Sequence, residues 1–250
     1  MSKLFYTYYD LLFEKKNYRR EVSDSIELYH RYCNLPLYSM IEIGCGTGNH
    51  TLEFVKTIPK ITALDIDKQM LSLAKNKLVT KSKNVTFKLS RIEQVNDKVP
   101  LIVALFNVIN YIEDFKRLDM FLKGVSKNLQ TGGLFIFDAW NGIAVIRSLP
   151  RVKMTNLKVK NLKIQAKLKS ATHLLKQQVL INYKISEFCG KKCLRKDSFQ
   201  FLHRLWTPYE ITEYAKKFQL HTIKIAPANA LRKKAGNDDW KIIYLLRKEG

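Results

Sequence analysis

The stretch Met40-Ile-Glu-Ile-Gly-Cys-Gly-Thr-Gly-Asn-His50 decides the fold of this 250-residue chain. Its apolar beginning predicts a buried strand, and the residues from His50 onward predict a helix. Between them lie three glycines, at positions 44, 46 and 48. Glycine lets the backbone turn tightly and lets a ligand approach the main chain closely. The stretch therefore predicts a nucleotide-type pocket at the carboxyl end of a strand.

The spacing of these glycines excludes two other phosphate-binding loops. Dinucleotide binding requires G-x-G-x-x-G, whereas this loop reads Gly44-x-Gly46-x-Gly48. The loop also lacks the lysine of the Walker pattern. A second predicted strand ends at Asp65, 21 residues after Gly44. A carboxylate at that point is suited to accept hydrogen bonds from both hydroxyls of a ribose.

Strands and helices alternate on both sides of the glycine loop. Predicted strands cover residues 38–43, 60–65, 85–89, 101–106 and 134–138, and predicted helices cover 50–56, 68–78 and 115–129. A turn at 131–133 precedes the last of these strands. This alternation predicts βαβ units and a parallel sheet whose two faces are covered.

The period changes after residue 150. Apolar and polar residues alternate over 157–160 and 162–169, which predicts half-buried antiparallel strands between about 151 and 205. A helix is predicted over 208–218, where Thr207 and Glu210 form a capping box. Strands over 221–225 and 240–246 then close the chain.

Composition and charge narrow the class of protein. The chain has 46% hydrophobic residues, which excludes intrinsic disorder, and no apolar run reaches the roughly 18 residues of a membrane span. Four cysteines are too few for a disulfide scaffold. We therefore expect a cytoplasmic globular protein with no membrane association.

The net charge of +22 is concentrated in the second half of the chain. Residues 1–142 hold 20 basic and 15 acidic residues, whereas residues 143–250 hold 24 basic and 7 acidic residues. We place an organisational boundary at residue 142. The predicted parts are an N-terminal helical lid over 1–37, a cofactor-binding core over 38–142, an antiparallel β insertion for substrate or dimerisation over 143–206, and closing elements of the core over 207–250.

Residues 38–142 resemble the class I S-adenosylmethionine-dependent methyltransferases. Residues 41–48 resemble the glycine motif of that family, 64–70 its ribose-binding acidic motif, and 131–137 its strand after the last Rossmann helix. The resemblance implies an α/β fold with a Rossmann-like class I sheet, to which the later residues add an antiparallel β subdomain on the substrate side. It also implies S-adenosyl-L-methionine as the cofactor.

The resemblance assigns cofactor contacts to several loops. Gly44 and Gly46 would pack against the methionine moiety, and Asp65 would hold the ribose. Ile66 and Met70 would border the adenine. Where the family often has an Asp near the adenine amino group, this chain has Ser90, so that contact falls to Ser90 or to the backbone of Arg91 and Ile92. The remaining predicted cofactor-binding residues are Tyr18, Glu42, Cys45, Phe106 and Asn107.

A narrower resemblance concerns the acceptor of the methyl group. Residues 107–110 lack the prolines of the Asn/Asp-Pro-Pro-Tyr motif, which argues against methylation of base amino groups. The stretches 9–18, 106–111 and 138–142 resemble the branch that N-methylates amino sugars carried on nucleoside diphosphates. A nucleotide-linked amino sugar is therefore the expected substrate.

Two positions depart from that branch. A His stands there at the position of Tyr111 and is implicated as the base, and a Tyr at the position of Phe13 lines the site. The phenols of Tyr111 and Tyr9 are the catalytic candidates here, because either can orient an amine or hydroxyl. The predicted substrate-binding residues are Phe13, Asn110, Trp140 and Asn141. A packing role for Tyr111 and turn roles for the asparagines remain open.

Other interpretations of the sequence remain beside this one. The basic second half would suit an RNA methyltransferase acting on tRNA or rRNA, and an inactive binding subunit could keep the same cofactor fold. His203 lies in an apolar run and is expected to be a hydrogen-bonded core histidine. Cys189 and Cys193 have no second Cys or His pair nearby, so no metal site is expected. Exposed strands at 151–205 make a homodimer conceivable.

Overall fold

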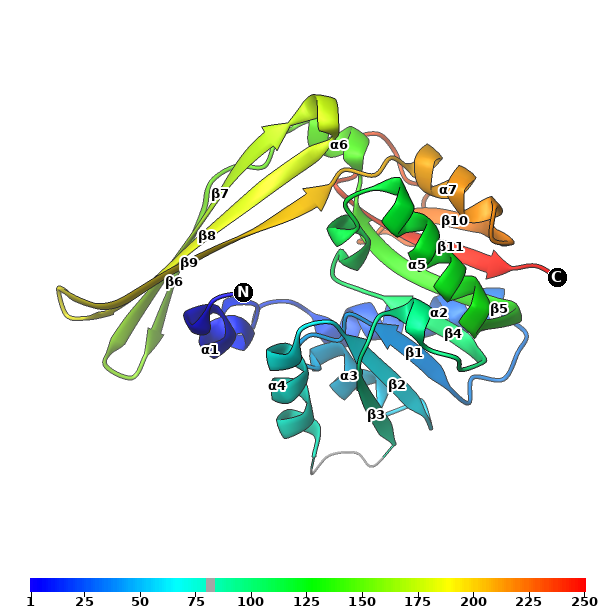
Figure 1. Cartoon of the computed structure of the whole chain (residues 1–250), viewed down its shortest axis with the longest axis horizontal. Coiled ribbons are helices and arrows are strands. Elements are labelled where there is room, and N and C mark those ends of the chain that lie inside the picture. Colours follow the sequence, from blue (N-terminus) through cyan, green and yellow to red (C-terminus); the bar gives the residue numbers. More distant parts are fainter. Residues whose placement is uncertain (80–83) are drawn as a thin grey trace.

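A seven-stranded sheet forms the centre of the computed structural model, which describes residues 1–79 and 84–250 (Figure 1). Its strands are β1 (Met40–Ile43), β2 (Ile61–Asp65), β3 (Val85–Leu89), β4 (Val99–Ala104), β5 (Leu129–Trp140), β10 (Leu220–Pro227) and β11 (Lys241–Lys248). They lie in the order β10-β11-β5-β4-β1-β2-β3, with β1 to β5 parallel and β11 antiparallel to both neighbours. The predicted parallel α/β sheet is thus confirmed.

Helices cover both faces of this sheet, which explains why β4 is buried along its whole length. One face packs against α5 (Phe115–Asn128) and α7 (Pro208–Lys216), and the other against α2 (Tyr18–Tyr32), α3 (Asn49–Phe54) and α4 (Lys68–Leu78). Short 3₁₀ turns η1 (Ile92–Gln94) and η2 (Val108–Tyr111) follow β3 and β4. The predicted capping box begins α7, because the Thr207 hydroxyl accepts from the Glu210 amide while the Glu210 carboxylate accepts from the Thr207 amide.

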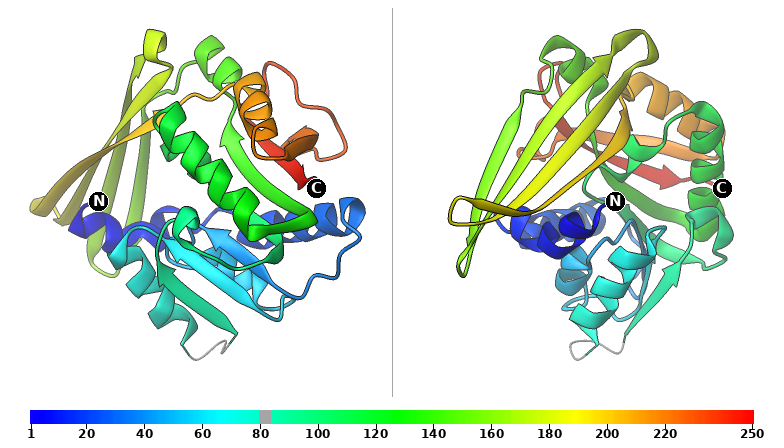
Figure 2. Two further views of the ribbon diagram at one scale, coloured as in Figure 1. Left: turned by 45° about the vertical axis from the view of Figure 1, so that its right-hand side comes forward. Right: turned by 60° about the vertical axis from the view of Figure 1, so that its left-hand side comes forward.

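The predicted antiparallel strands form a separate four-stranded sheet. They are β6 (Lys153–Val159), β7 (Leu162–His173), β8 (Gln178–Cys189) and β9 (Lys192–Arg204), paired in chain order, with η3 (Leu174–Lys176) between β7 and β8. The inner face of this sheet buries Ile164 and Ile185 against Leu4 and Phe5 of α1 (Lys3–Leu12). Figure 2 shows α1 between this sheet and the rest of the molecule. The short helix therefore joins the two sheets.

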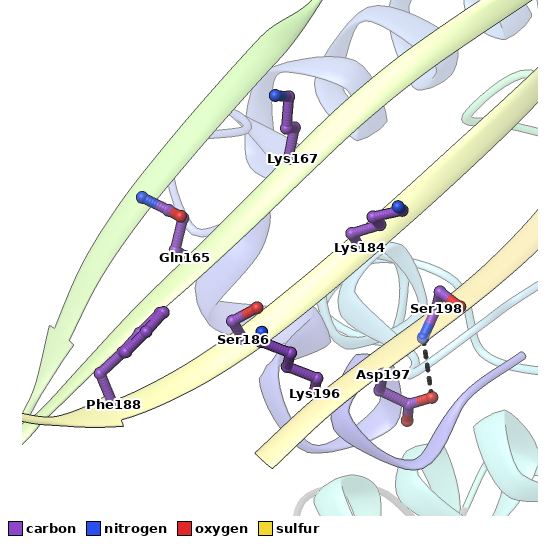
Figure 3. Close-up of a pocket in the computed structure, with 8 residues that line it drawn as sticks. All are labelled: Gln165, Lys167, Lys184, Ser186, Phe188, Lys196, Asp197 and Ser198. Carbon is purple, nitrogen blue, oxygen red and sulfur yellow. Dashed lines mark hydrogen bonds between the residues drawn. The ribbon is translucent and has the colours of Figure 1, made fainter. Parts of the chain in front are cut away.

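The outer face of the four-stranded sheet carries much of the basic charge. Strand register places Lys158 opposite Lys163, and Lys167 opposite Lys184, with side chains on the same side. Lys167, Lys184 and Lys196 line a shallow hollow on this face (Figure 3). Like charges directly opposite one another destabilise a sheet. Part of the basic surplus of the C-terminal half thus forms a lysine-rich face turned away from α1.

Three local predictions were wrong. The predicted strand over 101–106 ends earlier, at Ala104, because Phe106 and Asn107 have positive φ angles of 71° and 62°. The predicted turn at 131–133 lies inside β5, where Gly132 at φ 82° accompanies a shift in the register with β4. The expected turn at Asn141 instead begins α6 (Gly142–Arg147), since the Asn141 side chain accepts from the Ile143 amide.

Candidate active site

The glycine loop leaves one residue open to a ligand. All three glycines have positive φ angles, which other residues rarely adopt. A Cβ on Gly44 would lie 2.6 Å from Val108 Cγ2, and one on Gly48 would lie 2.8 Å from Leu78 Cδ1. A Cβ on Gly46 would meet only the Tyr9 hydroxyl, at 3.9 Å. Gly44 and Gly48 are therefore fixed by packing, whereas Gly46 presents bare backbone to the pocket.

Asp65 closes the same corner from the end of β2. Its Oδ2 accepts from the Gly46 amide at 2.7 Å, and its Oδ1 accepts from the Asp67 amide at 2.8 Å. Burial raises the pKa of this carboxyl, and the backbone hydrogen bonds oppose the increase. Each carboxylate oxygen keeps acceptor capacity beyond the bond it already receives. Asp65 can thus bind hydroxyl groups next to the exposed backbone of Gly46.

Residues from four segments line the pocket above this corner. The lining residues are Tyr9, Tyr18, Gly44, Cys45, Gly46, Thr47, Asn49, His50, Leu105 and Phe106. The remaining cavity is only about 20 Å³, so the aromatic side chains of the N-terminal segment fill most of it. Six of these residues are sequence-predicted site residues. Thr47, Asn49, His50 and Leu105 were missed, although the first three directly follow the glycines that marked the loop.

The N-terminal segment is bonded to the rim of this pocket. Asp10 Oδ1 accepts from the Thr47 hydroxyl at 2.6 Å and from the side-chain nitrogen Nδ2 of Asn49 at 3.0 Å. Lys77 Nζ lies 2.8 Å from Asp10 Oδ2. The hydroxyl of Tyr6 donates to Asp67 at 2.7 Å. These bonds hold α1 across the opening.

The residues predicted to border an adenine occupy different environments. Ile66 is 64% exposed beside the pocket, whereas Met70 is buried under α1. The Ser90 amide donates to the Asp65 carbonyl at 3.1 Å, and the Arg91 amide donates to Gln94 Oε1. The side chain of Ile92 lies in the core beneath α5 and does not reach the pocket. Only the backbone of Ile92 is therefore available for the predicted contact.

The loop after β4 is held by a chain of charged groups. Asp138 Oδ1 accepts from the Asn107 amide at 2.5 Å, and Asp138 Oδ2 lies 2.6 Å from Lys241 Nζ. Lys241 also lies 3.1 Å from Glu21, whose other oxygen is 2.8 Å from His50 Nε2. Burial of Glu21 opposes ionisation, but the His50 hydrogen bond and the neighbouring lysines outweigh it and lower its pKa. The network fixes the unusual backbone at Phe106 and Asn107 against α2.

A second group of side chains faces the inner surface of β9. Tyr111 of η2 is 49% exposed, and its ring centroid lies 5.3 Å from that of Phe201 and 4.6 Å from that of His203. The His203 ring also meets Trp140 edge-on at 4.8 Å. We call Tyr111, Trp140, Phe201 and His203 the His203 cluster. Phe13 lies nearer the glycine loop, with its ring 5.2 Å from Phe106.

Two predicted substrate-binding asparagines serve the walls of the site instead. The Asn110 side chain donates to the Arg204 carbonyl and accepts from the Trp140 amide, both at 2.9 Å. The Asn141 side chain caps α6 and donates to the Gly236 carbonyl at 3.2 Å. Their polar atoms are thus engaged with the backbone and fully buried. The structure does not bring them to the acceptor side as ligand contacts.

A family model described as a methyltransferase domain matches residues 35–214. The matched region contains the glycine loop, Asp65 and the loop after β4. The chain belongs to the methyltransferase family. The family assignment agrees with the prediction of an S-adenosylmethionine-dependent enzyme.

Relatives and solved structures support the same fold for this methyltransferase. A dTDP-3-amino-3,4,6-trideoxy-alpha-D-glucopyranose N,N-dimethyltransferase of Streptomyces venezuelae is 25% identical over 53% of this chain and 55% of its own length. The chain thus spans about half the length of this curated relative. An S-adenosylmethionine-dependent methyltransferase from Clostridium acetobutylicum has a TM-score of 0.82 at 23% identity, covering 99% of this chain and 98% of that one. The sugar N-methyltransferase KedS8 from Streptoalloteichus has a TM-score of 0.81 at 13% identity, covering 97% and 93%.

The phenols of the methyltransferase are hydrogen-bonding groups at neutral pH. Burial raises the pKa of Tyr18 to about 12 and also raises those of Tyr9 and Tyr111. Tyr18, Tyr111 and Asp65 lie near enough to Tyr9 to add to this increase. Tyr9 and Tyr18 line the pocket at the glycine loop together with Gly46, whose amide is bonded to Asp65. None of these phenols becomes a phenolate base near pH 7.

Glu42 of the methyltransferase lies away from the pocket, although it was predicted to bind the cofactor. It is 3% exposed, and its Oε2 accepts from the Thr51 hydroxyl of α3 at 2.6 Å. Burial raises its pKa from 4.5 to about 8. Its carboxyl group therefore joins β1 to α3 behind the glycine loop.

The pKa of Glu42 gives a pH-dependent stability prediction. An acid whose pKa is higher in the folded state binds more protons when folded, so the free energy of unfolding falls as the pH rises from about 5 to 8. A Glu42→Gln variant keeps the acceptor for Thr51 without this proton. We expect its stability relative to the natural protein to increase steadily across that window, measured by urea unfolding at several pH values. A constant difference would contradict the raised pKa.

Proposed function

We propose that this methyltransferase transfers the methyl group of S-adenosylmethionine to the amino group of a nucleotide-linked amino sugar. The cofactor supplies a methyl group already activated by the sulfonium charge. The backbone at Gly46 is open to its methionine part, and Asp65 is placed for the ribose hydroxyls. The exposed side chain of Ile66 offers an apolar surface for the adenine.

The acceptor site favours a small molecule. The observation that carries this proposal is the position of the His203 cluster, because its Tyr111 belongs to η2, whose Val108 packs against Gly44 of the glycine loop, while its other members belong to β5 and β9. An aromatic wall continues from this cluster along the inner face of the four-stranded sheet, where Tyr183 and Phe199 stack at 5.2 Å and pack against Phe5 of α1. Such walls suit a compact ring with few polar groups.

Methyl transfer to an amine makes limited demands on these residues. An in-line displacement needs a positioned lone pair, which a protonated phenol such as Tyr111 or Tyr9 can orient by hydrogen bonding. An amine loses its proton to water near pH 8, so no strong side-chain base is required. The amino-sugar assignment is supported by the activity of the Streptomyces venezuelae relative, an N,N-dimethyltransferase of a dTDP-linked amino sugar, and by KedS8, a sugar N-methyltransferase.

RNA methylation is the second candidate, and one observation favours it. The lysine-rich outer face of the four-stranded sheet would attract phosphates. However, that face is on the opposite side of the sheet from α1 and the His203 cluster. An RNA strand bound there would lie behind the acceptor space. Long-range attraction of a diphosphate carrier is the role we propose for this charge.

An acceptor panel tests the proposed function. The methyltransferase is incubated with labelled S-adenosylmethionine and nucleotide-linked sugars in matched pairs, one member with an amine and the other with a hydroxyl at the same carbon. We expect label only in the amino sugars, with a mass gain on nitrogen. Transfer to tRNA or rRNA, with a steep salt dependence and no sugar product, would support the RNA alternative.

The location of the protein, its oligomeric state and its division into parts are proposed as well. No helix in the described part of the chain is long and apolar enough to cross a membrane. A cytoplasmic location, a homodimer and the division of the chain into parts at 37, 142 and 206 stay proposals. Size-exclusion chromatography with light scattering measures the oligomeric state directly.

A further inference from the structure

His203 is the buried polar side chain that the fold leaves least explained. It lies near the end of β9 and is only 4% exposed. Neither of its ring nitrogens has a hydrogen-bond partner within the described residues, 1–79 and 84–250. The prediction that His203 is a hydrogen-bonded core histidine is therefore wrong, because no described residue bonds its ring nitrogens. Buried polar groups without partners are uncommon in folded proteins and cost stability.

The surroundings of His203 point toward the acceptor space. Phe199, Phe201 and His203 alternate along β9 on the inner face of the sheet, the side that packs against α1. Tyr111 covers the imidazole edge-on and is itself half-exposed. Tyr111 belongs to η2, whose Val108 packs against Gly44, so a movement of this ring would uncover one edge of the imidazole beside that turn.

Hydrogen bonds hold the elements around the His203 imidazole in place, but they do not hold the Tyr111 ring that packs on it. Asn110 bonds η2 to the Arg204 carbonyl and to the Trp140 amide. The Tyr111 side chain has no hydrogen bond to the described residues and projects from η2, which begins directly after the two residues with positive φ. The site is thus preorganised on three sides by β5, β9 and η2.

The chemistry of this site selects a neutral polar group. Burial lowers the pKa of His203 to about 3, so the imidazole is uncharged at neutral pH and offers one donor and one acceptor. A hydroxyl or an uncharged amine matches both. The guanidinium of neighbouring Arg204 is directed to the Lys176 carbonyl and the Gln177 side chain, so it does not add a cation for a phosphate or carboxylate.

We propose that His203 is an acceptor-binding residue, whose imidazole hydrogen-bonds a hydroxyl or the uncharged amine of the acceptor sugar when Tyr111 moves aside. The sugar ring then packs between the aromatic side chains of the His203 cluster. This inference rests on the proposed function. It gives the unpartnered nitrogens their partners in the bound state. Where the partner is the reacting amine, the unprotonated imidazole nitrogen accepts one of its N–H bonds, so the lone pair that must attack stays free.

Two variants of the full chain test the role of His203. His203→Phe keeps a flat ring and removes both nitrogens, whereas His203→Asn retains one donor and one acceptor. For His203→Phe we expect a higher melting temperature, because no unpaired nitrogen remains, and an unchanged melting shift on adding S-adenosylmethionine. We also expect its KM for the amino-sugar acceptor to rise about tenfold or more. His203→Asn should recover part of that loss.

A matched control separates this result from a general histidine effect. His221 lies on β10 with its side chain 41% exposed, 3.4 Å from Glu249, and His221→Phe should change neither KM nor the cofactor shift. An unchanged acceptor KM in His203→Phe, or a melting temperature below that of the natural protein, would overturn the inference. Natural protein that methylates no amino sugar would instead refute the proposed function, and the inference with it.

Discussion

Replacing Asp65 by Ala is expected to weaken the binding of S-adenosylmethionine by at least about 100-fold. Hydrogen bonds to a charged group contribute about 1.5–3 kcal/mol each, and this carboxylate is placed to accept from two ribose hydroxyls. The variant also loses the acceptor for the Gly46 amide, so the open backbone of the pocket is less well held. Isothermal titration gives the affinity, and the cofactor-induced rise in melting temperature should disappear.

Asp97, a carboxylate between η1 and β4, provides the control. Asp97 accepts from the Thr62 hydroxyl at 3.3 Å and lies 3.1 Å from Lys88 Nζ, away from the glycine loop. Asp97→Asn should bind the cofactor as the natural protein does. If the Asp65→Ala and Asp97→Asn variants bind the cofactor with equal affinity, Asp65 does not hold the ribose. A ligand-free melting scan of each variant shows whether a loss of binding reflects a loss of folding.

The second large effect is expected at Asp138, where a substitution should destabilise the fold and slow the reaction together. In Asp138→Ala the Lys241 ammonium loses one of its two carboxylate neighbours, and the Asn107 amide loses its acceptor. Removing one member of a buried ion pair costs about 3–5 kcal/mol. For a chain of this length that corresponds to a fall in melting temperature of about 6–20 °C. Turnover should fall because the loop carrying Phe106 and Tyr111 is released.

Two comparisons isolate the cause of this effect. Asp238 is 84% exposed and pairs with Arg147 at 3.5 Å, so Asp238→Ala should shift the unfolding free energy by no more than about 0.5 kcal/mol. The double variant Asp138→Ala, Lys241→Met should recover part of the lost stability, because no unbalanced ammonium remains. A similar fall in the Asp238 variant, or no recovery in the double variant, would contradict the assigned role of the network.

The sequence predicted the elements best where local signals agree. The bounds of α4 and β3 match the prediction, since Asp67 caps the first and alternation with polar turns delimits the second. The glycine turn after β1 and the position of Asp65 at the end of β2 were also predicted, because both lie at the ends of consecutive parallel strands. Such features are local in sequence or follow from parallel strand order.

The contacts between distant segments were not predictable in this way. Asn110 and Asn141 look like pocket residues in sequence, yet their partners are backbone groups about 95 residues away. His203 shows the opposite case, since its apolar neighbours predict burial but say nothing about whether a partner faces its nitrogens. Hydrophobic periodicity reports which side of an element is covered. It does not identify the polar atom that completes a hydrogen bond.

Helix α1 makes the two substrates of the reaction thermodynamically dependent on each other. Through Asp10 it is bonded to Thr47 beside the glycine loop, and through Tyr8, whose hydroxyl donates to Glu187 at 2.6 Å, to the four-stranded sheet. The cavity lined by Tyr9 of α1 and Tyr18 of α2 is only about 20 Å³, so we expect a nucleoside to displace these side chains on entry. Any such displacement also alters the wall that receives the methyl acceptor. By linkage, if binding of the first ligand changes the affinity for the second by some factor, binding of the second changes the affinity for the first by the same factor.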